Sequence, residues 1–201
     1  MKRTCVLFAL MCLASSAFGG TVNLHFLQPA GVNANGEYTY PYNFTVNGQF
    51  DKLMCVTLAN QIIPGETWQA NRYSVASLWG TANAPQFDEA AWLLKQEKPN
   101  NNEPAINWAA WAVFDQSIDL SQVIGAGNWL TAAQSQVYAQ GQFADVFVYD
   151  PIPGTQSWGG TPQVFLGSTP EPSTLLMVGS GLLGLGGWLR RKLLVLTSPT
   201  A

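Results

Sequence analysis

The sequence predicts an α+β fold for its central segment, and two observations support this. Segments with strand patterns come first, helical patterns follow, and strand patterns return at the end, whereas an α/β fold would alternate them. Residues 20–168 have the usual length of one domain and hold seven of the eight tryptophans, enough apolar material for a core. We therefore expect one ectodomain of antiparallel strands with two or three helices, flanked by an N-terminal signal peptide and one C-terminal transmembrane helix.

The strand predictions rest on alternation and on turn signals. Val22, Leu24 and Phe26 alternate with less apolar residues, which is typical of a strand with one buried face. Asn47-Gly48 is a strong hairpin signal between two aromatic or β-branched segments. The expected strands are residues 22–27, 38–46, 50–58, 146–149 and 163–166.

Three helices are expected between these two groups of strands. Asp88 is a candidate N-cap for a helix through Lys98, because Phe87, Ala91 and Leu94 follow helical spacing. Pro104 is suited to the first turn of a second helix that ends near residue 115. A third helix is expected over residues 128–140.

The N-terminus, residues 1–19, has the three parts of a secretory signal peptide. Lys2 and Arg3 precede an apolar run over residues 5–14. Small residues at Ala17 and Gly19 predict cleavage after one of them. The chain is therefore expected to leave the cytoplasm by the general secretory pathway.

The C-terminus combines a short acidic motif, an apolar segment and a basic cluster. Pro170, Glu171 and Pro172 precede the uncharged residues 174–189, and Arg190, Arg191 and Lys192 follow directly. As a helix, residues 174–189 would extend ~24 Å, which spans a bilayer with some thinning. The basic cluster would stay cytoplasmic. A plain stop-transfer anchor is the simpler interpretation of the same pattern.

Residues 169–192 resemble the sorting signal of PEP-CTERM proteins of Gram-negative bacteria, and residues 193–201 form a short tail beyond it. The resemblance implies recognition by an exosortase, an integral-membrane sorting enzyme, and a link to exopolysaccharide or biofilm. It also implies a precursor anchored in the inner membrane and a product at the cell surface or outside the cell.

Charge and cysteine content exclude several classes of function. Residues 20–168 carry four basic and eleven acidic side chains, a formal charge of −7. A domain this acidic, with no basic cluster, is a poor binder of nucleic acid. Cys5 and Cys12 lie in the signal peptide, so Cys55 has no partner for an intrachain disulfide.

Residues suited to catalysis are few, and we expect a protein that is not an enzyme, with no metal and no cofactor. His25 is the sole histidine and is interpreted as a strand surface residue. Two carboxylate pairs, Asp88-Glu89 and Asp115 with Asp119, are interpreted as helix caps or solvated groups rather than acid–base pairs. Most tryptophans are expected in the core, with Trp158 the best exposed candidate for stacking on a sugar.

Segments around Cys55 and the helix near Ile106 resemble the thioester domain of Gram-positive surface adhesins. The similar segments are Leu53-Met54-Cys55-Val56, Ala90-Ala91-Trp92-Leu93-Leu94 and Ile106-Asn107-Trp108-Ala109-Ala110-Trp111. The resemblance implies a strand cysteine, Cys55, joined to a helix carboxamide at Asn107, where that family has glutamine. An unlinked, buried Cys55 is the alternative, and it is the one that we predict.

The function predicted from sequence is therefore a non-enzymatic, exported protein of the cell surface or extracellular matrix. Its expected partners are an exosortase, the membrane through the C-terminal helix, and an extracellular polysaccharide. A covalent adhesin that uses Cys55 and Asn107 is the first alternative, and a secreted glycan-active enzyme is the second.

Overall fold

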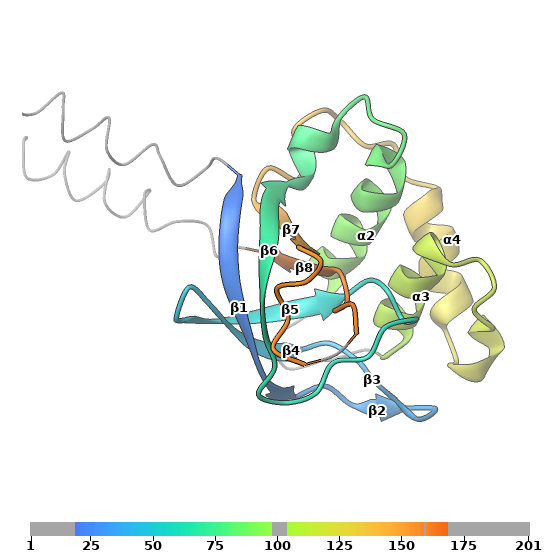
Figure 1. Cartoon of the computed structure of the whole chain (residues 1–201). Coiled ribbons are helices and arrows are strands. Elements are labelled where there is room, and N and C mark those ends of the chain that lie inside the picture. The colour runs from blue at the N-terminus through green and yellow to red at the C-terminus, as the bar shows by residue number, and fades with distance from the viewer. Residues whose placement is uncertain (1–18, 98–103, 159, 169–201) are drawn as a thin grey trace, which may run out of the picture. The chain divides into compact units, whose positions relative to one another are not determined.

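The structure is a computed structural model, and it describes residues 19–97, 104–158 and 160–168 (Figure 1). The predicted signal peptide, apart from Gly19, lies outside these residues. So do the predicted sorting signal at 169–192, with its helix at 174–189, and the tail at 193–201.

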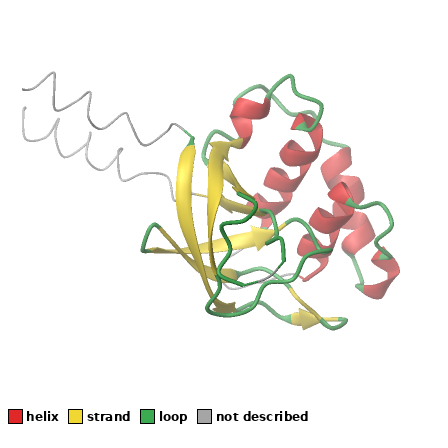
Figure 2. Ribbon diagram, in the orientation of Figure 1, coloured by secondary structure: helices red, strands yellow, loops and turns green. Residues whose placement is uncertain are grey.

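Six strands, yellow in Figure 2, close into an antiparallel barrel. Their order around the barrel is β1-β4-β5-β8-β7-β6. Their bounds are β1 (Gly20–Pro29), β4 (Tyr42–Val46), β5 (Gln49–Cys55), β6 (Thr67–Ser74), β7 (Val146–Pro151) and β8 (Phe165–Ser168). The first strand pairs with both β4 and β6, and this double pairing closes the barrel. A barrel leaves no unpaired sheet edge.

The predicted fold class is corrected by this closure: the described residues form a six-stranded closed barrel with three α-helices, rather than the α+β arrangement expected. Strand β6, which pairs with β1 along one side and β7 along the other, is not among the strands predicted from the sequence. Trp68 and Ala70 alternate inward along β6, so a strand signal was present. Its outward residues, Thr67, Gln69 and Asn71, are polar. Because the segment as a whole is therefore not apolar, it was not predicted as a strand.

The hairpin prediction at Asn47-Gly48 is confirmed. Both residues have positive φ, 49° and 82°, as the tight turn between β4 and β5 requires. The predicted strand at 38–46 divides instead into β3 (Glu37–Tyr38) and β4. The first of these pairs with β2 (Asn33–Ala34) in a small separate hairpin.

Three α-helices follow β6, and they lie together on one side of the barrel in Figure 1: α2 (Ala84–Gln96), α3 (Pro104–Phe114) and α4 (Ala126–Gln134). Two single-turn 3₁₀ helices accompany them, η2 (Val75–Leu78) and η3 (Leu120–Gln122). The expected start of the first helix at Asp88 is wrong, because Asn83 is the N-cap and a proline lies in the first turn. The start of α3 at Pro104 is confirmed, and α4 ends earlier than expected.

The domain has two apolar clusters, one on each side of the barrel wall. The interior cluster is aromatic: the Phe44 ring centroid lies 4.8 Å from that of Phe165, and the two rings meet edge to face. The second cluster lies between the outer faces of β5, β7 and β8 and the helices, and it includes Met54 and Val148. Successive residues of β5 therefore enter different clusters, as expected for a strand buried on both faces.

Helix α3 contributes to both clusters, which explains its composition. It has no charged residue, and residues 105–113 are all buried. Trp108 and Trp111 join the interior cluster, while Ile106 and Val113 join the outer one. A helix that is apolar on all sides is typical of a core position.

Candidate functional site

Cys55, the last residue of β5, is fully buried in the interior cluster. Its Sγ donates a hydrogen bond to the Thr57 carbonyl oxygen, 3.1 Å away. Burial raises the pKa of the thiol to about 12, and donation of its proton to the Thr57 carbonyl oxygen also favours the protonated form. A thiol in this setting stays protonated and is a poor nucleophile.

Asn107 lies in α3 with no exposed surface, and the structure brings it into contact with Cys55. The Asn107 Nδ2 donates to the Cys55 carbonyl oxygen at 2.8 Å. Its Oδ1 accepts from the Tyr40 backbone N–H at 2.7 Å. One buried carboxamide therefore joins the end of β5, helix α3 and the segment before β4, which are far apart in the sequence.

The hydrogen bonds of Cys55 and Asn107 indicate what chemistry the two residues can perform in this arrangement. Both polar ends of the Asn107 carboxamide are engaged with backbone groups, and the Cys55 thiol donates to a different residue. The contact between the two passes through the main chain of Cys55, not through its sulfur. As described, the arrangement is a hydrogen-bonded connection rather than a nucleophile aimed at a carbonyl carbon.

The other candidate residues are dispersed. His25 is half-buried on β1, opposite Thr45 and Thr67 in the neighbouring strands. Asp119 caps η3 by accepting from the Ser121 N–H, as its interpretation as a cap predicts.

The carboxylates that are neighbours in the sequence, Asp88 with Glu89 and Asp115 with Asp119, do not shift each other's pKa. Asp115 accepts from both the N–H and the hydroxyl of Ser117, and these bonds lower its pKa. Bonds from Ser121 and Gln122 lower the pKa of Asp119 in the same way. Burial raises the pKa of Asp88 and, separately, of Glu89. Each of these carboxylates is therefore governed by its own surroundings, not by a second carboxylate.

Most tryptophans are placed as predicted. Trp68, Trp108 and Trp111 are buried, and Trp92 packs on Trp129 with ring centroids 6.1 Å apart. The prediction that Trp158 is exposed is confirmed, since 56% of its surface is accessible. Trp79, at the end of η2, is exposed to a similar degree.

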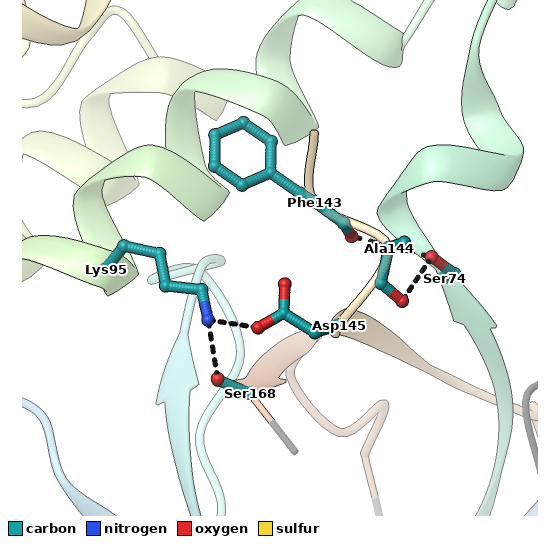
Figure 3. Close-up of polar contacts among 6 residues, drawn as sticks. All are labelled: Ser74, Lys95, Phe143, Ala144, Asp145 and Ser168. Carbon is teal, nitrogen blue, oxygen red and sulfur yellow. Dashed lines mark hydrogen bonds and ion pairs between the residues drawn. The ribbon is translucent and has the colours of Figure 1, made fainter. Parts of the chain in front are cut away.

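The C-terminal end of the domain is held by polar contacts from helix α2 (Figure 3). The Lys95 ammonium forms an ion pair with Asp145 and donates to the Ser168 hydroxyl at 2.9 Å. Beside it, the Ser74 hydroxyl donates to the Ala144 carbonyl oxygen at 3.0 Å. The bond from Lys95 reaches the last residue of β8, Ser168, where the described part of the chain ends, and the bond from Ser74 ties the end of β6 to the segment before β7.

Ser168 is also the first residue of a family match. Residues 168–192 match the family model described as the PEP-CTERM protein-sorting motif. The chain carries a PEP-CTERM sorting signal. The match includes Pro170, Glu171 and Pro172 and the cluster Arg190, Arg191 and Lys192, which sequence analysis assigned to this signal.

The PEP-CTERM signal implies an exported protein that an exosortase processes at the membrane and that is then placed at the cell surface. No curated protein and no solved structure matches the chain. Within residues 19–97, 104–158 and 160–168, no helix is long and apolar enough to cross a membrane. The predicted span at 174–189 lies outside those residues.

Proposed function

We propose that this chain is a non-enzymatic protein of the cell surface or extracellular matrix that associates with exopolysaccharide after exosortase processing. The observation that carries the proposal is the position of the PEP-CTERM signal, which begins at the last residue of a closed, well-packed domain. Such a domain is suited to being delivered as a folded unit. We expect from the sorting signal that the chain is cleaved near Pro170-Glu171-Pro172, which would release the domain just beyond its last strand.

The geometry of the titratable residues supports the non-enzymatic part of the proposal. His25 lies on a strand wall, Asp115 and Asp119 bond to neighbouring serines, and the Cys55 thiol is protonated and buried. General acid–base catalysis needs groups that converge on one reacting atom. Hydrolysis of a panel of polysaccharides by the purified protein would instead indicate the glycan-active alternative.

Sorting is tested with Glu171→Ala in the full chain, produced in a host that has an exosortase. We expect the parent protein to be processed and to reach the outside of the cell, and Glu171→Ala to accumulate as a membrane-bound precursor. Glu37→Ala, which removes the same side chain from β3, is the matched control and should behave as the parent. Equal release of all three proteins would leave residues 169–192 as a passive anchor.

The contact between Asn107 and Cys55 is the observation that favours a covalent adhesin as the second candidate. A thioester would form a bond from Cys55 Sγ to Asn107 Cγ and expel Nδ2 as ammonia, which also takes up the thiol proton. We propose that the two residues remain unlinked, because the carboxamide is engaged at both ends and the thiol donates to Thr57.

Mass spectrometry separates these alternatives. The unlinked protein has the mass of its sequence and takes up no methylamine. A thioester lowers the intact mass by ~17 Da and incorporates methylamine, and both signs disappear in Cys55→Ala and in Asn107→Ala. That second pattern would establish the covalent adhesin instead.

A further inference from the structure

The sorting signal begins at a strand of the barrel. Ser168 is both the last residue of β8 and the first residue of the matched PEP-CTERM motif. The strand just before it belongs to the core, since Leu166 has no exposed surface and Gly167 is also buried. In the sequence, Thr169 alone separates Ser168 from Pro170. The region of expected cleavage therefore follows a packed strand almost directly.

The two halves of β8 are held differently. Phe165 and Leu166 pair with β5 on one side and with β7 on the other. Among the described residues, Gly167 and Ser168 pair with β7 only. Segments at the end of an element, with fewer partners, open at a lower free energy than the core. The last two residues of β8 can thus separate from β7 while the rest of the barrel stays closed.

Lys95 of α2 holds this end of β8 from a position far outside the sorting signal (Figure 3). Its ammonium donates a hydrogen bond to the Ser168 hydroxyl at 2.9 Å, and it also forms an ion pair with Asp145. Because Lys95 and Asp145 both lie outside β8, their ion pair does not need β8 in place. Separation of the strand end therefore breaks the bond between Lys95 and Ser168 and leaves the ion pair intact.

The same two residues lie where a processing enzyme has to bind. Proteins that bind a peptide in extended form do so through hydrogen bonds to its main-chain N–H and C=O groups. An exosortase that acts near Pro170 needs the residues just before it, and the main chain of Gly167 and Ser168 is already paired with β7. The enzyme and β7 therefore compete for one stretch of backbone.

We propose that the end of β8 controls the rate of exosortase processing: Gly167 and Ser168 leave the barrel before the enzyme binds, and the bond from Lys95 keeps this open form rare. The inference rests on the processing near Pro170-Glu171-Pro172 proposed above, to which it adds a means of control. Where opening is fast compared with cleavage, the rate of proteolysis follows the population of the open form.

Pulse–chase labelling of the full chain, in a host that has an exosortase, measures the half-time for conversion of the precursor. Lys95→Met removes the ammonium, keeps the apolar stem and leaves the signal untouched, and we expect processing ~2–5-fold faster than in the parent. Gln96→Met is the matched control on the next residue of α2. Its side chain bonds to Trp92 within the same helix, so the variant should be processed at the parent rate.

A flexible insertion separates access to the signal from its recognition. Six residues of alternating Gly and Ser placed between Ser168 and Thr169 leave Pro170-Glu171-Pro172 unchanged and supply an extended segment that is not part of β8. With the insertion, we expect faster processing of the parent and no remaining difference between the parent and Lys95→Met.

The outcomes distinguish this control from the sorting proposal. Equal half-times for the parent and Lys95→Met, with Glu171→Ala still blocked, would refute the role of β8 and leave sorting intact. Asn107→Ala weakens the domain elsewhere and should be processed at the parent rate; acceleration equal to that of Lys95→Met would assign the effect to global unfolding and refute local opening. Processing of Glu171→Ala at the parent rate would remove the sorting proposal on which this inference rests.

Discussion

Removal of the buried Asn107 side chain is the perturbation whose effect the structure defines best. Asn107→Ala deletes both hydrogen bonds of the carboxamide, to the Tyr40 N–H and to the Cys55 carbonyl oxygen. Each of these backbone groups then loses the partner that Asn107 supplies. Asn107 has no exposed surface, so the groups that it contacts lie beside a buried side chain. A buried polar group left unpaired costs ~1–3 kcal/mol. The two groups together would cost ~2–6 kcal/mol. Because Tyr40 is only partly buried, we expect a loss in the lower half of this range, about 3 kcal/mol in the free energy of unfolding.

Equilibrium unfolding in urea, followed by tryptophan fluorescence of the processed protein, measures this loss. Asn128→Ala is the matched control, because Asn128 is an exposed residue of α4, and its replacement should change stability by less than about 0.5 kcal/mol. A loss for Asn107→Ala below ~1 kcal/mol, close to that of the control, would refute the argument that the carboxamide connects β5, α3 and the segment before β4.

Asn107→Asp gives a second readout that a simple loss of packing would not produce. An oxygen then replaces Nδ2 opposite the Cys55 carbonyl oxygen, so the native state favours the protonated carboxyl and raises its pKa. The folded pKa exceeds the unfolded one, and the variant therefore becomes less stable as the pH rises from about 4 toward 7. For Asn107→Ala, the loss in the free energy of unfolding relative to the parent should be the same from about pH 4 to pH 7.

Three further predictions concern the thiol, the ion pair and the sorting signal. Cys55 should react with a maleimide only after denaturation. Since its pKa is raised to about 12, stability should fall as the pH rises above about 9, with a shallower fall in Cys55→Ala; an equal slope in both proteins would argue against this cause. Lys95→Met, which keeps the apolar stem, should lower stability by about 1 kcal/mol at low salt and by less in 1 M NaCl, because the pair with Asp145 is about one-third exposed; a loss independent of salt would assign the effect to packing. Glu171→Ala should leave urea stability unchanged while blocking processing, and a destabilised ectodomain would show that the residue has a structural role.

The sequence was sufficient for the features that are read locally along the chain. The sorting signal is a linear pattern of Pro170-Glu171-Pro172, an apolar segment and a basic cluster, and a linear pattern can be recognised without any fold. The hairpin at Asn47-Gly48 was predictable because a two-residue turn dictates its own backbone angles. Pro104 marked the start of α3 for a similar reason, since proline is favoured in the first turn of a helix.

The resemblance to thioester domains implied a covalent link between Cys55 and Asn107, whereas we predicted an unlinked Cys55, and neither specified which atoms of the two residues would meet. Which atoms meet depends on side-chain directions, and the structure places the carboxamide against the main chain of Cys55 while the thiol donates to Thr57. A pattern of residue types does not specify that choice. The hydrogen bonds do, because each buried polar group must find a partner within a fixed backbone.

Closure of the barrel was decided by the tertiary structure alone. The pairing of β5 with β8 joins Cys55 to Phe165, and β1 pairs with the unforeseen β6. Pairing between strands so far apart has no local signature, because it depends on which faces become buried together. The same closure brought Thr45, His25 and Thr67 into register across β4, β1 and β6, although no spacing along the chain relates these residues.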